Sequence, residues 1–336
     1  MDMSDIELPS DCVSDDPMPD ADETELPPDV ASDAASSVPD LPAAVEEVVS
    51  DLEHSDDESP QGSQLPSDLD EDSDVELPDA DPQWASIAIP GNGPHRQALH
   101  PTPDLLQSRL GRQDIAEFYS PGRVVQAAGA YGLIGDFSAD ILTGWDFKLQ
   151  QVRGISLQLL AIFDIFMLII CPPCTAFSVL QRLWNFKKMS HEKVTLMLEE
   201  GMLFLKHAME SAEVQVRRGM YFIFEHPCGA SSWKQPIVKH VAGLPGVKMV
   251  TFDQCMFGLV SPLHKTPMRK RTRLMTNSPA VVKLFHKRFC DRSHDHKCIA
   301  GEEGGIKISV WAQRYPPALC NAFVEATCMT PGCRAE

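Results

Sequence analysis

Blocks of apolar and polar residues alternate along the chain from about residue 110 and predict strands and helices in turn. Short apolar runs predict strands at 115–119, 133–140, 161–170 and 220–224. Apolar residues at intervals of three and four predict a helix over 192–218, and shorter helical patterns cover 123–131 and 316–327. Strands that alternate with helices predict a doubly wound α/β domain with a mostly parallel sheet over residues 110–330.

Two of the predicted strands end at residues that can carry chemistry. The strand at 161–170 runs into two prolines and then Cys174, and the strand at 220–224 runs directly into Glu225. Because the carboxyl ends of parallel strands lie at one edge of a sheet, where ligands bind in open α/β folds, Cys174 and Glu225 are expected to share a site. After the first strand, Ser120 and Pro121 predict an N-cap and a first helical residue.

Charge divides the chain into two unlike parts. The first 95 residues hold 28 Asp and Glu and no Lys or Arg, whereas the rest holds 20 acidic and 29 basic residues. The net charge of −19 is therefore −28 in the first part and +9 in the second. The first part is rich in Pro and Ser and has one aromatic residue, Trp84, so we predict a disordered acidic tail over 1–105. Residues 331–336 are predicted to form a short C-terminal tail.

A short acidic unit around Leu-Pro recurs in the predicted tail, at 7–11, 25–29, 64–68 and 76–79. The unit could bind docking partners, and low-complexity drift is the alternative. The ten cysteines are scattered and no signal peptide precedes them, which predicts an intracellular protein. The apolar stretch 154–170 contains Gln158 and Asp164 and is too short to span a membrane.

The segment from Pro173 to Ser178, Pro-Cys-Thr-Ala-Phe-Ser, resembles the Pro-Cys-x-x-Phe-Ser loop of the DNA (cytosine-5) methyltransferases. This resemblance implies a Rossmann-like methyltransferase fold in which Cys174 is the catalytic nucleophile. It also implies that Glu225 is the acid next to the target base, because the family has Glu-Asn-Val where this chain has Glu-His-Pro. At the end of an apolar strand, Glu225 could hold a proton for this purpose. His226 replaces the Asn that braces the loop in the family.

Further segments extend the resemblance. Phe257-Gly258-Leu259, followed by an arginine-rich strand, implies that Arg271 and Arg273 hold the target base and a phosphate from one face of that strand. The family also implies S-adenosylmethionine as methyl donor, although residues 117–122 contain one glycine where the family has several. The candidate donor-binding residues are Phe118, Ser120, Gly122, Asp136, Asp140 and Pro172.

A second group of residues has the chemistry of metal ligands. Cys290, His294, His296 and Cys298 are four possible ligands within nine residues, and Cys290 with His294 or His296 could bind zinc together with a distant cysteine such as Cys320. The alternative is a polar loop in which these residues have no shared role, because their spacing fits no standard zinc finger.

The resemblance thus implies an S-adenosylmethionine-dependent, cytosine-5 methyltransferase-like protein that acts on nucleic acid, DNA rather than RNA. The chain also resembles modules of retroelement-derived polyproteins of protists, and the resemblance implies a nuclear location. Two alternatives remain open: a catalytically inactive nucleic-acid-binding or interaction protein that keeps the fold, and a structural zinc module. Donor binding discriminates the first and metal content the second.

Overall fold

The computed structural model describes residues 113–333 of the chain. The predicted acidic tail, its Leu-Pro units and the last three residues lie outside the described residues, so their predictions stay untested. Within residues 113–333, no helix is long and apolar enough to cross a membrane.

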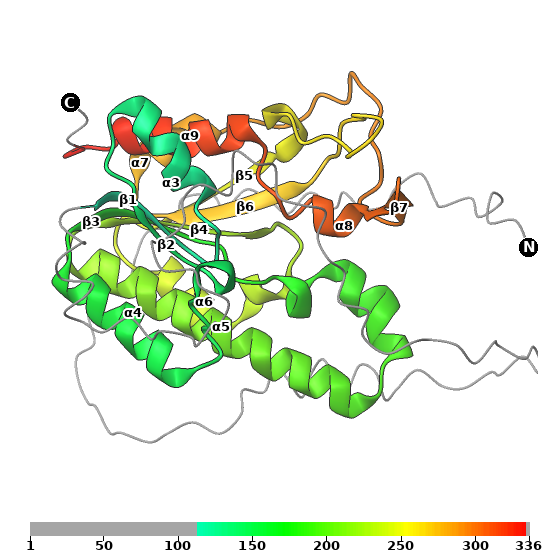
Figure 1. Cartoon of the computed structure of the whole chain (residues 1–336), viewed down its shortest axis with the longest axis horizontal. Helices are drawn as coiled ribbons and strands as arrows, with labels where there is room; N and C mark the ends of the chain where they lie inside the picture. Colours follow the sequence, from blue (N-terminus) through cyan, green and yellow to red (C-terminus); the bar gives the residue numbers. More distant parts are fainter. Residues whose placement is uncertain (1–112, 334–336) are drawn as a thin grey trace, which may run out of the picture.

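Six strands form one central sheet in the described part of the chain, in the order β2-β1-β3-β4-β6-β5 (Figure 1). They are β1 (Gln113–Phe118), β2 (Phe137–Ala139), β3 (Ile165–Ile170), β4 (Tyr221–Pro227), β5 (Lys248–Asp253) and β6 (Arg271–Thr276). The first four pair in parallel, and β6 is antiparallel to both of its neighbours. The predicted α/β fold with a mostly parallel sheet is confirmed.

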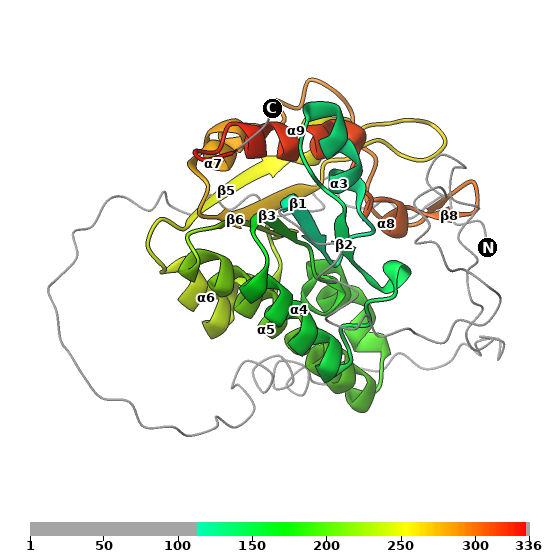
Figure 2. The same cartoon turned by 60° about the vertical axis from the view of Figure 1, so that its left-hand side comes forward.

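Helices cover both faces of this sheet (Figure 2). On one face lie α3 (Arg123–Ala128), α7 (Pro279–Phe285) and α9 (Pro317–Cys328). On the other lie α4 (Gln150–Ile162), α5 (His191–Arg217) and α6 (Pro236–Ala242). A short α8 (Ile308–Trp311) follows a small hairpin of β7 (Glu302–Glu303) and β8 (Ile306–Lys307). Each face has its own apolar core, so the sheet is buried from both sides.

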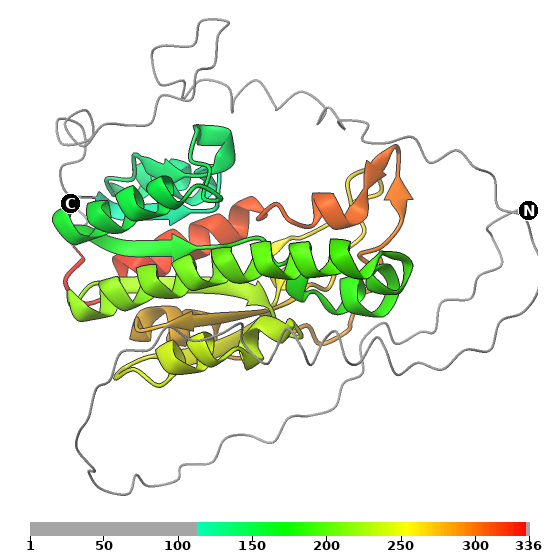
Figure 3. The same ribbon diagram turned by 90° about the horizontal axis from the view of Figure 1, so that it is seen from below.

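The longest helix, α5, follows the predicted apolar pattern closely. Figure 3 shows the molecule from below, with α5 running across it. Val194, Leu198, Leu205 and Met209 are buried along its inner face. The hydroxyl of Ser190 accepts a hydrogen bond from the Lys193 N–H and caps its start. The helix thereby supports β3 and β4 along their length.

Three local predictions differ from the structure. The apolar run at 161–170 is divided, because α4 continues to Ile162 and β3 begins at Ile165. The second strand covers only Phe137–Ala139 of the predicted 133–140. The predicted N-cap is wrong: Gly122, at a φ of 85°, caps α3, since the Ser120 hydroxyl donates to the Glu117 carboxylate instead.

The antiparallel direction of β6 has a physical reason in its connection. A parallel return from β5 would need a crossover element, usually a helix, and residues 254–270 contain only a single 3₁₀ turn at Gln254–Phe257. The chain therefore comes back antiparallel, and β6 starts at the same edge of the sheet at which the other strands end. We call this edge the carboxyl edge.

Candidate active site

The structure brings the loop of Cys174 and the end of β4 together at the carboxyl edge. Ile170 pairs with Phe224 in the parallel β3–β4 ladder, so the residues that follow Ile170 lie beside Glu225. Because β6 is antiparallel, Lys270 enters this edge just before Arg271, and its ammonium nitrogen lies 3.8 Å from Glu225 Oε1. Three elements thus deliver a thiol, a carboxylate and an amine to one place.

Close packing fixes the loop of Cys174 against α5. Cys174 precedes a 3₁₀ turn at Thr175–Phe177, in which Ala176 and Phe177 are buried. Gly201 of α5 faces this turn, and a Cβ at Gly201 would lie only 2.5 Å from the Cβ of Ala176. Glycine is needed at Gly201 because the helix approaches the turn too closely for any side chain.

His226 braces the same loop from β4. Its Nε2 lies 3.1 Å from the carbonyl oxygen of Pro172, and its Nδ1 lies 2.7 Å from the Ser232 hydroxyl. Because a carbonyl oxygen can only accept, Nε2 carries the proton and Nδ1 accepts from Ser232. Burial lowers the pKa of His226 to about 4, so the ring is neutral near pH 7. His226 therefore braces the loop of Cys174 through its hydrogen bond to the carbonyl of Pro172.

The Glu225 carboxylate is buried and its two oxygens have different surroundings. Oε2 accepts a hydrogen bond of 2.8 Å from the Tyr315 hydroxyl, which also lies 3.0 Å from the sulfur of Cys171. Oε1 faces Lys270 and has no hydrogen-bond partner among the described residues. A buried carboxylate oxygen without a partner costs folding free energy, and such an atom at a strand end is typical of a ligand-binding position.

The thiol of Cys174 responds to the same groups. Burial raises its pKa above the ordinary cysteine value; the nearby Lys270 ammonium lowers this pKa and the Glu225 carboxylate raises it. Both charges therefore lie close enough to Cys174 to influence its ionisation. The balance keeps Cys174 mainly as the thiol near pH 7, so a bound ligand or proton acceptor has to favour the thiolate.

The two predicted arginines lie on one face of β6, as expected, and each has partners within the fold. Arg271 makes two hydrogen bonds of 3.0 and 3.1 Å to the carboxylate of Asp253. The guanidinium of Arg273 lies over the ring of Trp233, and its Nη2 is 3.4 Å from the sulfur of Cys228. Their predicted contacts with a base and a phosphate stay a prediction.

The loop after β1 is held by a buried carboxylate. Glu117 accepts a hydrogen bond from the Ser120 hydroxyl and bonds of 2.6 and 2.7 Å from the N–H groups of Val124 and Val125. Burial raises the pKa of Glu117, and these three hydrogen bonds oppose the rise. The carboxylate thus takes the place of a conventional N-cap for α3. Ser120 is buried, and its carbonyl accepts from the Ser138 hydroxyl at 2.6 Å.

Tyr119 turns the chain at the end of β1 in a left-handed conformation, with a φ of 60°. Non-glycine residues rarely adopt this conformation, and at Tyr119 the side chain secures it. The hydroxyl of Tyr119 lies 2.7 Å from Nδ1 of His207, whose Nε2 lies 2.8 Å from the Ser156 hydroxyl. Burial lowers the pKa of His207 to about 3, so this link is neutral.

The other predicted donor-binding residues are separated by the structure. Phe118 is fully buried and packs against Phe137 and Phe147. Asp136 precedes β2 and lies at the amino end of that strand, away from the carboxyl edge. Asp140 directly follows β2 at the carboxyl edge, where Oδ1 accepts from the Leu142 N–H at 2.9 Å. Gly122, Asp140 and Pro172 therefore lie at the edge that holds Cys174.

The predicted metal-binding residues also come together, with a different fourth partner. Cys290, His294 and His296 form a cluster with Cys255, which could hold a metal ion. Cys320 lies in α9, where Glu117 and Arg123 are its charged neighbours, so it is not the distant cysteine of this cluster.

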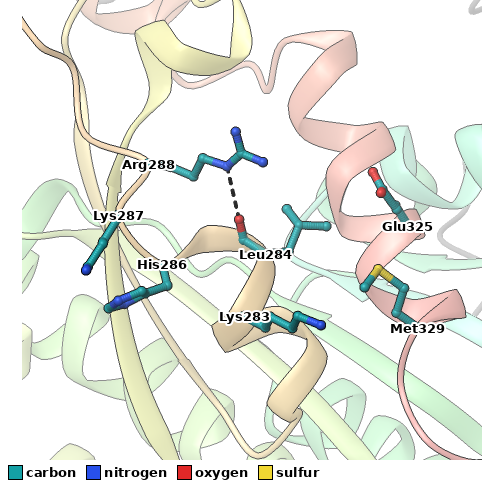
Figure 4. Close-up of a pocket in the computed structure, with 7 residues that line it drawn as sticks. All are labelled: Lys283, Leu284, His286, Lys287, Arg288, Glu325 and Met329. Carbon is teal, nitrogen blue, oxygen red and sulfur yellow. Dashed lines mark hydrogen bonds between the residues drawn. The ribbon is translucent and has the colours of Figure 1, made fainter.

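An open depression of about 390 Å³ lies on the helical layer of α7 and α9 (Figure 4). Its rim is mainly basic, and it shares no lining residue with the groups around Cys174. The lining residues are Lys283, Leu284, His286, Lys287, Arg288, Glu325 and Met329.

No protein-family model matches the sequence, and no curated protein matches it significantly.

Two residues of the site, Lys270 and Tyr315, were not predicted from the sequence. Lys270 stands between Arg269 and Arg271, so nothing in the local sequence distinguishes it from its basic neighbours. The strand direction that brings Lys270 to the carboxyl edge depends on long-range pairing. Tyr315 is 90 residues from Glu225, and its only local signal is the proline that follows it.

Proposed function

We propose that this protein is an S-adenosylmethionine-dependent methyltransferase-like protein that acts on carbon 5 of cytosine in nucleic acid. The observation that carries the proposal is the convergence of Cys174, Glu225 and Lys270 at the carboxyl edge. A nucleophile beside a buried carboxylate oxygen without a hydrogen-bond partner is the pair that addition to a pyrimidine requires. The resemblance of residues 173–178 to the cysteine loop of the cytosine-5 methyltransferases supports the same assignment.

The methyl donor would lie next to this pair, at the carboxyl ends of β1 and β3. The chain leaves β1 toward β2 on one side and returns to β3 on the other, and ligands in α/β sheets bind at such a switch point. The fit to the donor is partial. In this proposal the half-buried carboxylate of Asp140 and the backbone of residues 119–122 would contact the donor, whereas Phe118 is fully buried and Asp136 lies at the other edge of the sheet.

In this proposal the donor supplies an electrophilic methyl group, and the side chains of this chain handle the base. The Cys174 thiolate adds to carbon 6 of cytosine, and the electron pair of the 5,6 double bond moves into the ring. Glu225, protonated when the base binds, gives its proton to ring nitrogen 3 through Oε1, the oxygen that faces Lys270, and so neutralises that charge. Carbon 5 then takes the methyl group. Its proton passes to a water molecule, the double bond re-forms, the thiolate leaves carbon 6, and the proton on nitrogen 3 returns to Glu225.

In this proposal Lys270 acts on both groups that take part in the step, Cys174 and Glu225. Its ammonium favours the thiolate of Cys174 and keeps a positive charge beside Oε1 of Glu225. An extruded base would enter a site that already contains both the nucleophile and the acid, as base-modifying enzymes require.

A trapping experiment tests the proposal. The full chain is incubated with S-adenosylmethionine and an oligonucleotide that carries 5-fluorocytosine, because fluorine blocks the elimination that releases the enzyme. We expect a covalent adduct that maps to Cys174 by peptide mass spectrometry and is absent from Cys174→Ser. Cys328→Ser is the matched control, since Cys328 is the last residue of α9 and lies outside the proposed site.

Glu225→Gln separates the catalytic role from binding. We expect adduct formation to fall by about 100-fold or more, while calorimetric binding of S-adenosylmethionine and S-adenosylhomocysteine stays within about twofold of the unmodified chain. Donor binding without any adduct would favour the catalytically inactive nucleic-acid-binding alternative. An adduct that persists in Cys174→Ser would move the nucleophile elsewhere and refute the assignment.

A further inference from the structure

A cluster of two cysteines and two histidines lies beyond the end of β5, apart from the groups around Cys174. Cys255 belongs to the turn that directly follows β5, and Cys290, His294 and His296 belong to the loop that follows α7. The four ligand atoms all lie within 4.8 Å of one another. Two segments more than thirty residues apart in sequence thus place four good zinc ligands at one point.

Two sulfur–nitrogen distances within the cluster match those of a tetrahedral site. Cys290 Sγ lies 3.5 Å from Nε2 of His294 and 3.4 Å from Nε2 of His296. Zinc–sulfur and zinc–nitrogen bonds of about 2.3 and 2.05 Å at a tetrahedral angle place sulfur and nitrogen about 3.6 Å apart. The agreement holds for both imidazoles at once. A single thiol–imidazole hydrogen bond would explain one of these contacts but not the convergence of four ligand atoms.

The surroundings of Cys290 are also those of a metal-bound thiolate. The Arg292 N–H lies 3.3 Å from Cys290 Sγ, which is the kind of outer contact that stabilises a coordinated sulfur. The N–H of Cys290 itself donates to Asp253 Oδ2 at 3.0 Å, which fixes the backbone that carries the sulfur. Cys290 is buried, while the two histidines are half-buried and close the outer side.

We propose that Cys255, Cys290, His294 and His296 bind one zinc ion as a structural tie. Two thiolates and two imidazoles complete a tetrahedron, so the ion has no open position for a water or a substrate and takes no part in catalysis. The ion fastens the loop after α7 to the end of β5. This inference stands on the four ligands alone and does not rest on methyl transfer.

The tie has a consequence for the carboxyl edge, because Asp253 connects it to β6. The same carboxylate that accepts from the Cys290 N–H also accepts hydrogen bonds from Nε and Nη2 of Arg271. Lys270 precedes Arg271, and its carbonyl accepts from the N–H of Gln254 at 3.0 Å. The ion therefore fixes the segment that delivers Lys270 to Glu225, through backbone and side-chain contacts rather than through the reaction.

Metal analysis of the full chain tests the site. We expect one zinc per chain by elemental mass spectrometry after purification without chelator. We also expect cobalt, exchanged into the site, to show the intense visible absorption of a tetrahedral thiolate complex. Cys255→Ser should lose at least about nine tenths of the zinc, whereas Cys298→Ser, a change in the same loop, should keep about one equivalent. Zinc retained in Cys255→Ser, or lost only in Cys298→Ser, would overturn the ligand set.

Thiol protection keeps the proposal testable if the variants fail to fold. In the unmodified chain, a chelator should raise the alkylation rates of Cys255 and Cys290 by at least about tenfold, since a zinc-bound thiolate is shielded, and added zinc should restore protection. Alkylation rates that do not change with chelator would refute the site. Neither experiment uses a methyl donor, so its failure is distinguishable from a failure of the proposed function.

Discussion

The hydroxyl of Tyr315 donates a 2.8 Å hydrogen bond to Oε2 of Glu225 and joins the segment before α9 to the end of β4. This contact leaves Oε1 as the oxygen that faces Lys270 and the loop of Cys174. Tyr315 thereby decides which oxygen of the carboxylate is open to a ligand. Its ring packs against Phe323 of α9, with 5.7 Å between the centroids, so the hydroxyl is held in place by the apolar core.

Tyr315→Phe should slow formation of the 5-fluorocytosine adduct by about 10- to 100-fold. The lost hydrogen bond to a charged group is worth about 1.5–3 kcal/mol, and without it Glu225 is free to turn both oxygens toward Lys270. Binding of the methyl donor should stay unchanged, because the Tyr315 hydroxyl contacts Glu225 and Cys171, and neither is among the residues proposed to bind the donor. Single-turnover rates and calorimetric donor affinities, measured side by side, check this.

The matched control is Tyr221→Phe, which removes a hydroxyl at the other end of β4, where the ring packs against Phe166. We expect its adduct rate to equal that of the unmodified chain. An equal loss of rate in both variants would indicate a general effect on β4, and the positioning role of Tyr315 would then be wrong.

Alkylation of Cys174 should become faster as the pH rises, and should still be increasing at pH 9. Burial raises the pKa of this thiol, so the reactive thiolate is scarce at neutral pH and accumulates only above the ordinary range for cysteine. Iodoacetamide labelling between pH 7 and pH 10, followed at the Cys174 peptide, measures this. A rate that levels off below pH 8 would contradict the prediction.

Two substitutions should shift that profile in opposite directions. Glu225→Gln removes a negative neighbour, lowers the pKa of Cys174 and should raise its alkylation rate at pH 8 by roughly three- to tenfold. Lys270→Met removes the positive neighbour and should lower the rate by a similar factor. The Cys333 peptide in the same digest serves as internal reference. Shifts of the same sign would show that the two charges do not act on Cys174 as described.

Features that depend on local sequence could be predicted. The run of apolar residues that ends at Pro172 identified β3 and its carboxyl end, and the spacing of Val194, Leu198 and Leu205 identified α5. Each of these signals lies within a few turns or one strand of the chain. The position of Cys174 beside Glu225 followed from them, because parallel strands end at the same edge.

Features that depend on long-range pairing could not be predicted. The antiparallel insertion of β6, which brings Lys270 to the site, is decided by pairing with β4 and β5. A shift in the predicted start of β2 was enough to place Asp136 at the wrong edge, because the prediction merged a loop with the strand. Similarly, the metal cluster receives Cys255 from a turn that no local pattern connects to Cys290.

Glu117→Gln should destabilise the fold by about 2–4 kcal/mol. The buried Glu117 carboxylate accepts three hydrogen bonds, and the glutamine amide would place an NH₂ group, itself a donor, against these three donors. Chemical denaturation followed by tryptophan fluorescence measures the change. Glu199→Gln, on the exposed face of α5, is the control and should change the stability by less than about 0.5 kcal/mol. A small effect at Glu117 would show that α3 does not depend on this carboxylate.

Removal of residues 1–105 should strengthen binding of nucleic acid by about tenfold near 50 mM salt, because 29 acidic groups would no longer compete for a part of the chain with a net charge of +9. The gain should shrink as salt is added. Fluorescence anisotropy with DNA and RNA of equal length measures both effects. A chain of full length with the acidic residues of this segment changed to Asn and Gln is the control. If the shortened chain binds no better at matched salt, competition by the acidic segment is excluded.

The position of β6 between β4 and β5 also affects how the chain folds during translation. The strands cannot join this sheet in the order in which they are synthesised. One edge of β4 stays unpaired until residues 271–276, which form β6, have been made. Until then Phe222, Ile223 and Phe224 border an unpaired edge, the kind of surface that aggregates. Chains that stop after β4 would contain the complete Cys174 loop, but the strand that carries Glu225 would be paired only with β3 and would lack β6 on its other edge. Translation must therefore pass β6 before the sheet around Cys174 and Glu225 is complete, so we expect truncated products to aggregate.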